Sequence, residues 1–240
     1  MSANSIETLK KYFSIPYGGH VFIFTNKITL EDIQQHTFTE ILSHKNAVDA
    51  NGKLGYSVAM AVFEAIKEHS DGLQGKKVLD IGGNTGYFSF LAVENGAEGT
   101  MVEKQEKQAN VAKAIAEIRK LNVKIFNGLI QDYLVASTEI FDCVFMLNMF
   151  DQMLRTDEET AWKTLRQVSE RCKMLFFMNG PTEQIPNTKG LATSTPIKPN
   201  PASNIFSDPD FKVIICLTKY KNHKILLENG YENRQLQVYW

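Results

Sequence analysis

The 240-residue sequence predicts an α/β protein in which helices cover both faces of a parallel sheet. The first reason is a strict alternation of short strands with longer amphipathic helices from residue 56 to residue 178. The second is that the strands are nearly continuous apolar runs, as strands buried on both faces should be. Parallel strands joined through helices satisfy both observations, because such crossovers place the helices on the faces of the sheet.

The alternating strands and helices begin with a helix. Val58, Ala61, Val62, Ala65 and Ile66 recur at helical spacing and predict a helix over residues 56–69. Asn95 and Gly96 end the next helix, because this pair favours a turn. We expect strands at 76–81, 98–102, 123–126, 141–147 and 174–178, with helices at 56–69, 87–95, 105–121 and 158–171.

The two ends of the chain interrupt this alternation. Residues 1–55 read as an N-terminal helical appendage, which we expect to cover a substrate, and residues 56–240 as the main domain. Residues 179–210 hold most of the seven prolines and predict a long loop. After it we expect strands at 213–220 and 235–240, while 223–229 fits either a hairpin strand or a helix.

The composition excludes several functional classes. A net charge of −1 gives no global field toward nucleic acid, so bulk DNA or RNA is an unlikely partner. No apolar run approaches the roughly 18 residues of a membrane span. Cys143, Cys172 and Cys216 form no CxxC pair, so we expect reduced, buried thiols, a cytoplasmic protein and no metal site.

A glycine-rich turn after the first strand is the strongest candidate site. The strand 76–81 ends in Asp80 and Ile81, and the turn then opens the next helix at Tyr87. Glycines let the backbone approach a ligand and adopt left-handed conformations without Cβ strain. The turn does not spell the G-x-G-x-x-G of a dinucleotide loop. Its candidate cofactor-binding residues are Asp80, Gly82, Gly83, Asn84, Gly86 and Tyr87.

Three further segments follow the next strands. Glu103 ends the second strand, where an acid can accept hydrogen bonds from both hydroxyls of a ribose, and Lys104 follows it. A solvated turn glutamate is the alternative. After the third strand, Leu129 and Ile130 could flank an adenine and Asp132 could accept from its amine, or Asp132 could cap a helix.

The fourth strand is followed by Asn148, Met149, Phe150 and Asp151. Ligands of open α/β sheets bind beyond the carboxyl ends of the strands, so this segment should lie beside the reactive end of a cofactor. We therefore take Asn148 and Asp151 as candidate catalytic residues and Asn148 and Met149 as cofactor contacts.

These four segments, over residues 56–178, resemble the class I S-adenosylmethionine-dependent methyltransferases. The resemblance implies a Rossmann-like, doubly wound, mostly parallel seven-stranded sheet and S-adenosyl-L-methionine as the cofactor. It implies that residues 80–86 hold the methionine part, Glu103 the ribose and 129–132 the adenine. The commonest family loop has glycine at Asn84, and the spelling here is similar to that of some sugar and natural-product methyltransferases. The segment 148–152 also resembles the methyltransferase domain of O-antigen chain-terminating enzymes.

The acceptor is open, because aligning an activated methyl donor requires no fixed catalytic motif. We expect a hydroxyl, phosphate or amine of a small molecule or glycoconjugate, and the absence of a DPPY or NPPY motif disfavours base methylation. His20 is a further candidate base, Tyr56 a further cofactor contact, and the candidate substrate residues are Tyr17, His36, Lys221 and His223. An NAD-dependent oxidoreductase and a non-catalytic cofactor-binding module are the alternatives, and the oligomeric state is open.

Overall fold

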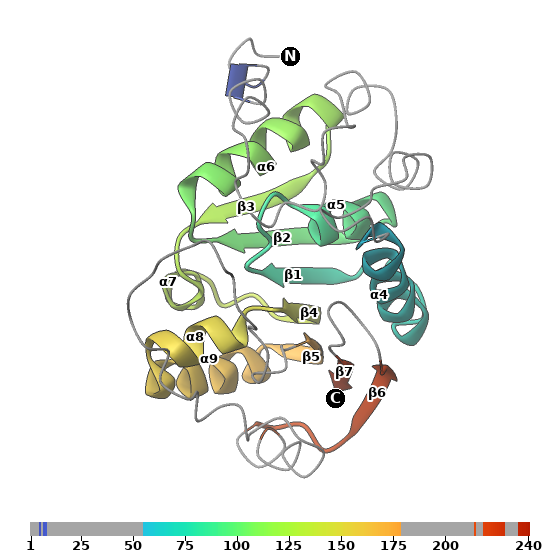
Figure 1. The fold of residues 1–240 in the computed structure, drawn as a ribbon, viewed down its shortest axis with the longest axis vertical. Coiled ribbons are helices and arrows are strands. Elements are labelled where there is room, and N and C mark those ends of the chain that lie inside the picture. The colour runs from blue at the N-terminus through green and yellow to red at the C-terminus, as the bar shows by residue number, and fades with distance from the viewer. Residues whose placement is uncertain (1–4, 6, 9–54, 179–213, 215–217, 229–234) are drawn as a thin grey trace, which may run out of the picture.

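A seven-stranded sheet organises the protein (Figure 1). The structure is a computed structural model, and it describes residues 5, 7–8, 55–178, 214, 218–228 and 235–240. Along the sheet the strands follow the order β3-β2-β1-β4-β5-β7-β6. The strands are β1 (Lys77–Ile81), β2 (Glu98–Glu103), β3 (Val123–Asn127), β4 (Phe141–Leu147), β5 (Cys172–Met178), β6 (His223–Leu227) and β7 (Leu236–Tyr239).

Strand direction divides the sheet. The five strands β1 to β5 pair in parallel, whereas β7 runs antiparallel to both β5 and β6. From β1 the chain first moves outward through β2 to β3, and it then returns to the other side of β1 for β4 and β5. This is a doubly wound sheet, and β1 and β4 flank the point at which the winding reverses.

Helices cover both faces. On one face, α4 (Gly55–His69), α5 (Tyr87–Glu94) and α6 (Glu106–Arg119) share a buried apolar cluster with the strands. On the other face, α7 (Ile130–Ala136), α8 (Phe150–Thr156) and α9 (Glu158–Glu170) share a second cluster. Figure 1 shows α7, α8 and α9 grouped together on their side of the sheet.

The apolar strand sequences follow from this double cover. In β4, Cys143 and Phe145 pack into the cluster beneath α4 to α6, whereas Val144 and Met146 pack beneath α7 to α9. Successive side chains of a strand point to opposite faces, so a strand buried on both faces must be apolar at every position. The mostly parallel seven-stranded sheet and the strand-helix alternation are therefore confirmed.

One expectation about the elements was wrong, and two short helices were not predicted. In the predicted strand 213–220, the described residues are not extended: Ile214 is helical, Thr218 donates a backbone hydrogen bond to the Ile214 carbonyl, and 218–220 lie outside any strand. The short helices α7 and α8 were not predicted, since each spans only two turns and shows little periodicity. Of the two readings of 223–229, the hairpin strand is confirmed as β6.

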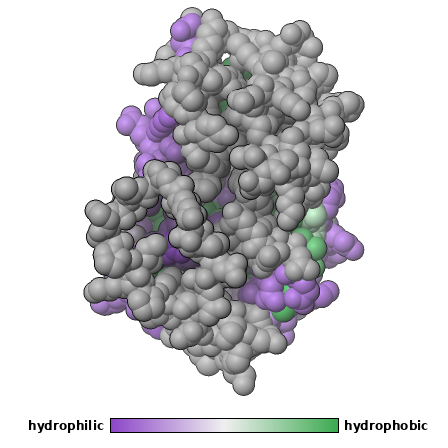
Figure 2. Space-filling view, viewed as in Figure 1, coloured by the Kyte–Doolittle hydropathy of each residue, from purple (hydrophilic) through white to green (hydrophobic). Residues whose placement is uncertain are grey.

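The N-terminal appendage lies almost wholly outside the described residues, as do 179–210 and Cys216. Ser5 is buried and helical, and its hydroxyl donates a hydrogen bond to the Glu117 carboxylate on α6. Within the described part, no helix is long and apolar enough to cross a membrane. In the view of Figure 2 the described surface is mostly hydrophilic, with small hydrophobic areas.

Candidate functional site

The glycine loop lies at the carboxyl end of β1, beside the reversal of the winding. Three of its residues have positive φ angles: Gly82 at 73°, Asn84 at 54° and Gly86 at 97°. Asn84 therefore adopts the left-handed conformation in which asparagine is tolerated, and the turn keeps its shape without the commoner glycine. A Cβ on Gly82 would lie 2.3 Å from the Cγ and Sδ atoms of Met149, so the loop packs tightly against the segment after β4.

Asp80 lies beneath this loop. It is 4% exposed, and its Oδ2 atom accepts a hydrogen bond of 2.6 Å from the Ser89 hydroxyl. Burial, with a smaller contribution from the nearby Glu103 carboxylate, raises the pKa of Asp80 to about 6, although the hydrogen bonds from Ser89 oppose both effects. Among the described residues, the hydrogen bonds from Ser89 are therefore what stabilises the charged form of Asp80, and no cation forms an ion pair with it.

Glu103 lies at the end of β2 and is 6% exposed. Its Oε2 atom accepts from the backbone N–H of Asn84 at 2.9 Å, and its Oε1 atom accepts from the backbone N–H of Gln105 at 2.7 Å. An ionised carboxylate offers about four acceptor sites, so about two remain for a ligand. The backbone thus orients the carboxylate and ties it to the glycine loop.

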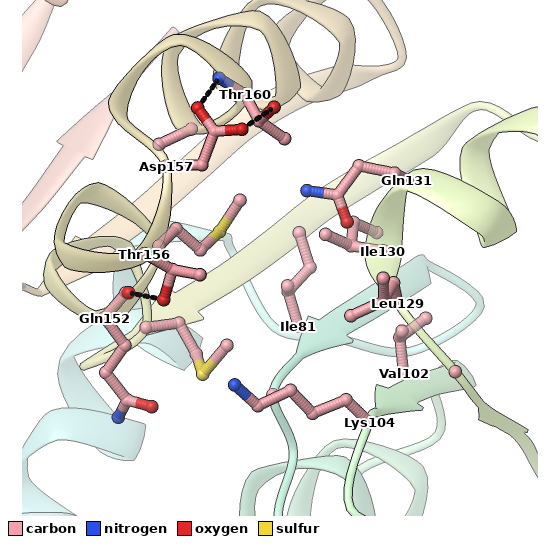
Figure 3. Close-up of a pocket in the computed structure, with 15 residues that line it drawn as sticks. Ile81, Val102, Lys104, Leu129, Ile130, Gln131, Gln152, Thr156, Asp157 and Thr160 are labelled. Atoms are coloured by element: carbon pink, nitrogen blue, oxygen red, sulfur yellow. Dashed lines mark hydrogen bonds between the residues drawn. The ribbon is translucent and has the colours of Figure 1, made fainter.

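A cavity of about 310 Å³ opens beside these residues, between the ends of β1 and β2 and the helices α7, α8 and α9 (Figure 3). Ile81, Val102 and Ile130 form an apolar wall, and the Lys104 side chain reaches across toward α8. The cavity is lined by Ile81, Gly82, Val102, Lys104, Gly128, Leu129, Ile130, Gln131, Met149, Gln152, Met153, Thr156, Asp157, Thr160 and Ala161. Its apolar faces suit a flat heteroaromatic ring.

The polar groups of the far wall are largely used within the protein. Asp157 is the N-cap of α9 and accepts from the backbone N–H of Thr160 at 3.1 Å and from its hydroxyl at 2.7 Å. These hydrogen bonds hold the pKa of Asp157 below its usual range. The Thr156 hydroxyl donates to the Gln152 carbonyl at 2.9 Å. Figure 3 shows both interactions. Lys104 and Asp157 are the charged side chains that line the cavity, and neither forms an ion pair with a described residue.

The segment after β4 contributes a second strained asparagine. Asn148 has a φ of 61°, and its Oδ1 atom, like that of Asn84, is buried and makes no hydrogen bond to a described residue. Met149 is the N-cap of α8 and lines the cavity. Asp151 is buried in the first turn of α8, where its Oδ2 atom lies 3.5 Å from Arg155. Asn148 and Met149 thus join the loop and Glu103 at one edge of the sheet.

Several predicted residues lie elsewhere. Asp132 is exposed in the first turn of α7 and does not line the cavity, whereas Gln131 does. Tyr87 is buried at the start of α5, 4.8 Å from Phe88 between ring centroids. Tyr56 lies in α4, but its side chain is outside the description. Tyr17, His20 and His36 also lie outside the described residues.

Lys221 and His223 are separated from this site. His223 pairs with Tyr239, which pairs with Leu175, three residues before the carboxyl end of β5 at Met178. His223 thus lies on the edge strand β6, four strands away from β1 in the sheet, and Lys221 lies two residues before it, whereas the site lies at the carboxyl ends of β1, β2 and β4. No role was predicted for Ser89. The cavity wall on α8 and α9 was not expected either, because α8 was not predicted. The Asp157 cap three residues before Thr160 was a usable signal for the start of α9.

The described residues contain no cluster of His, Cys, Asp and Glu that could hold a metal ion. Cys143 and Cys172 are buried free thiols, and burial raises the pKa of Cys143 and raises that of Cys172 to about 12. Such thiols stay protonated at neutral pH and are poor nucleophiles.

Comparison with known proteins finds a family match over part of this chain. Residues 78–171 match the family model described as a methyltransferase domain. A ubiquinone biosynthesis O-methyltransferase of Idiomarina loihiensis is 36% identical over 85 residues, which span 34% of this chain and 35% of that protein.

Solved structures agree in fold. A co-crystal structure of WbdD with the kinase inhibitor LY294002 superposes with a TM-score of 0.60 at 14% identity, over 98% of this chain and 47% of that one. A structure described as the bifunctional kinase-methyltransferase WbdD gives 0.59 at 15% identity, over 98% and 45%. The chain thus spans less than half the length of these relatives.

Proposed function

We propose that this chain, a class I methyltransferase over residues 78–171, binds S-adenosyl-L-methionine and methylates a hydroxyl, phosphate or amine of a small molecule or glycoconjugate. A hydroxyl is favoured, since the curated relative is named an O-methyltransferase. The observation that carries the proposal is the Glu103 carboxylate, buried, held by two backbone amides and retaining free acceptor sites beside an apolar cavity.

The residues at this edge fit the cofactor in two parts. The ribose hydroxyls would donate to Glu103, and the adenine would lie in the cavity between Ile130 and Met149, with Gln131 or Asp132 beside its amine. The methionine half would lie along the glycine loop. Its ammonium group supplies the donors that the buried Oδ1 atoms of Asn84 and Asn148 lack.

Bound S-adenosylmethionine would supply an activated methyl group, so the protein has to position the acceptor rather than generate a strong nucleophile. Asn148 and Met149, at the end of β4, would line the space in which the acceptor meets the methyl group. Asp151 is a candidate base, although it is buried and interacts with Arg155. His20 and residues 1–55 would complete the acceptor side, and we place the protein in the cytoplasm on the strength of its cysteines.

Isothermal calorimetry separates this proposal from its alternatives. We expect S-adenosylhomocysteine to bind and NAD to show no binding under the same conditions. Binding of NAD alone would favour an oxidoreductase, and binding of neither would exclude both enzymes. A non-catalytic module would bind S-adenosylhomocysteine yet form none from S-adenosylmethionine with any acceptor among phenols, sugar hydroxyls, phosphate monoesters and amines.

A further inference from the structure

One hydrogen bond closes the glycine loop. Asp80 belongs to β1 and Ser89 to the first turn of α5, and their side chains meet at 2.6 Å across nine residues of sequence. Both residues are buried, at 4% and 1% exposed. The contact therefore joins the strand before the loop to the helix after it, and every residue of the loop lies between its two ends.

The same carboxylate replaces a missing helix cap. Gly86 is the N-cap of α5 and has no side chain to accept from the first turn. The backbone N–H of Ser89, the third helical residue, also hydrogen bonds to Asp80. A carboxylate near a helix N-terminus stabilises the exposed amides there. Asp80 thus acts on α5 as a cap from a neighbouring strand.

Gly83 rests directly against this contact. A Cβ on Gly83 would lie 2.9 Å from the Asp80 Oδ2 atom and 2.6 Å from the Met101 Cγ atom. These distances are too short for any residue but glycine without a shift of its neighbours. The Asp80 carboxylate consequently supports the loop backbone from below, and its hydrogen bonds are directed to α5.

We propose that the Asp80–Ser89 hydrogen bond is a clasp that sets the conformation of residues 82–86 and thereby the affinity for the amino-acid half of the cofactor. Asp80 and Ser89 are positioning residues in this scheme, and neither is a cofactor ligand. The inference rests on the proposed function, because the loop is expected to hold that half of S-adenosylmethionine. It revises the expectation that Asp80 itself binds the cofactor.

The test compares two ligands. S-Adenosylhomocysteine carries the amino-acid half, and 5′-methylthioadenosine lacks it. In calorimetry at pH 7.5, well below the melting temperature, Ser89→Ala should weaken S-adenosylhomocysteine about tenfold and 5′-methylthioadenosine less than about twofold. Asp80→Asn keeps the shape of the side chain and provides a second variant. Since the two residues act through one contact, the double variant should bind no more weakly than the weaker single variant.

Ser169→Ala is the matched control. Ser169 is also fully buried, and its hydroxyl donates to the Arg166 carbonyl at 2.7 Å on α9, away from the loop. It should leave both affinities unchanged. Equal weakening of the two ligands by Ser89→Ala, or no weakening of either, would overturn the clasp. If the wild-type protein binds neither ligand, the proposed function fails instead.

Discussion

The two ends of the sheet treat their charges in opposite ways. At the amino end, lysines pair with partly buried carboxylates: Lys77 with Glu139 at 3.0 Å, and Lys173 with Asp142 at 2.7 Å. At the carboxyl end, Asp80 and Glu103 are buried, and neither forms an ion pair with a described cation. Groups that satisfy each other contribute to stability. At the carboxyl end, Asp80 positions the glycine loop through Ser89, and the unused acceptor sites of Glu103 are available to a ligand.

The largest expected effect concerns the charge of Asp80. Its folded-state pKa is raised by burial to about 6 from an ordinary value of 3.8, so the folded protein binds more protons than the unfolded chain between these values. The free energy of unfolding should therefore fall as the pH rises from about 4 to about 6. Asp80→Asn should remove this dependence on pH. The difference in the free energy of unfolding between wild type and Asp80→Asn should therefore change by up to about 3 kcal/mol across this pH range.

Urea unfolding of both proteins at pH 4.5 and pH 7.5 measures this difference. Asp157→Asn serves as the control, because Asp157 is an exposed N-cap on α9 whose pKa is lowered rather than raised. If the free energies of unfolding of wild type and Asp80→Asn differed by the same amount at both pH values, the raised pKa of the buried Asp80 carboxyl would be contradicted.

Glu103→Ala comes next and should weaken S-adenosylhomocysteine about a hundredfold, because it removes the acceptor for two ribose hydroxyls. Wild type should also discriminate against 2′-deoxy-5′-methylthioadenosine relative to 5′-methylthioadenosine, and Glu103→Ala should not. Glu98→Gln, at the exposed start of the same strand, should leave every affinity unchanged. Full affinity in Glu103→Ala would remove the ribose assignment.

Asn148→Gly tests whether the site retains strain for function. Glycine adopts the left-handed backbone conformation of residue 148 without Cβ strain, and it removes a buried side-chain oxygen that has no hydrogen bond to a described residue. We therefore expect the free energy of unfolding to rise by about 1 kcal/mol. The same change should weaken S-adenosylhomocysteine about fivefold and spare 5′-methylthioadenosine. Thermal melting and calorimetry measure the two effects, and a loss of stability would show that the Asn148 side chain is satisfied.

The smallest effect belongs to the amino end. Lys173 is 70% exposed, and its hydrogen bond holds the pKa of Asp142 below the usual range. Lys173→Met should cost less than about 1 kcal/mol near neutral pH, because solvent screens an exposed pair. The cost should shrink as the pH falls through the lowered pKa of Asp142, because the protonated carboxyl no longer attracts the Lys173 ammonium. Any change in S-adenosylhomocysteine affinity would contradict the view that the charges at the amino end of the sheet contribute to stability alone.

Local patterns were sufficient for the elements that have a regular period. The parallel core β1 to β5, the glycine loop and Glu103 were all predicted, and the left-handed turn at Asn84 is confirmed by its φ of 54°. The short helices α7 and α8 were missed, and α7 presents Gln131 to the cavity instead of Asp132. Which of two neighbouring polar residues faces inward depends on where a short helix begins, and no periodicity marks that position.

The sequence by itself determined which residues surround the glycine loop, because strand, turn and helix are neighbours along the chain and their backbone requirements are local. Only the tertiary structure decided what lies beneath and opposite that loop. Ser89 meets Asp80 because α5 folds back over β1, and Met149 meets Gly82 because β4 pairs with β1. Lys221 and His223 lie far from the site because β6 joins the sheet at its edge, four strands from β1, a position set by long-range strand pairing.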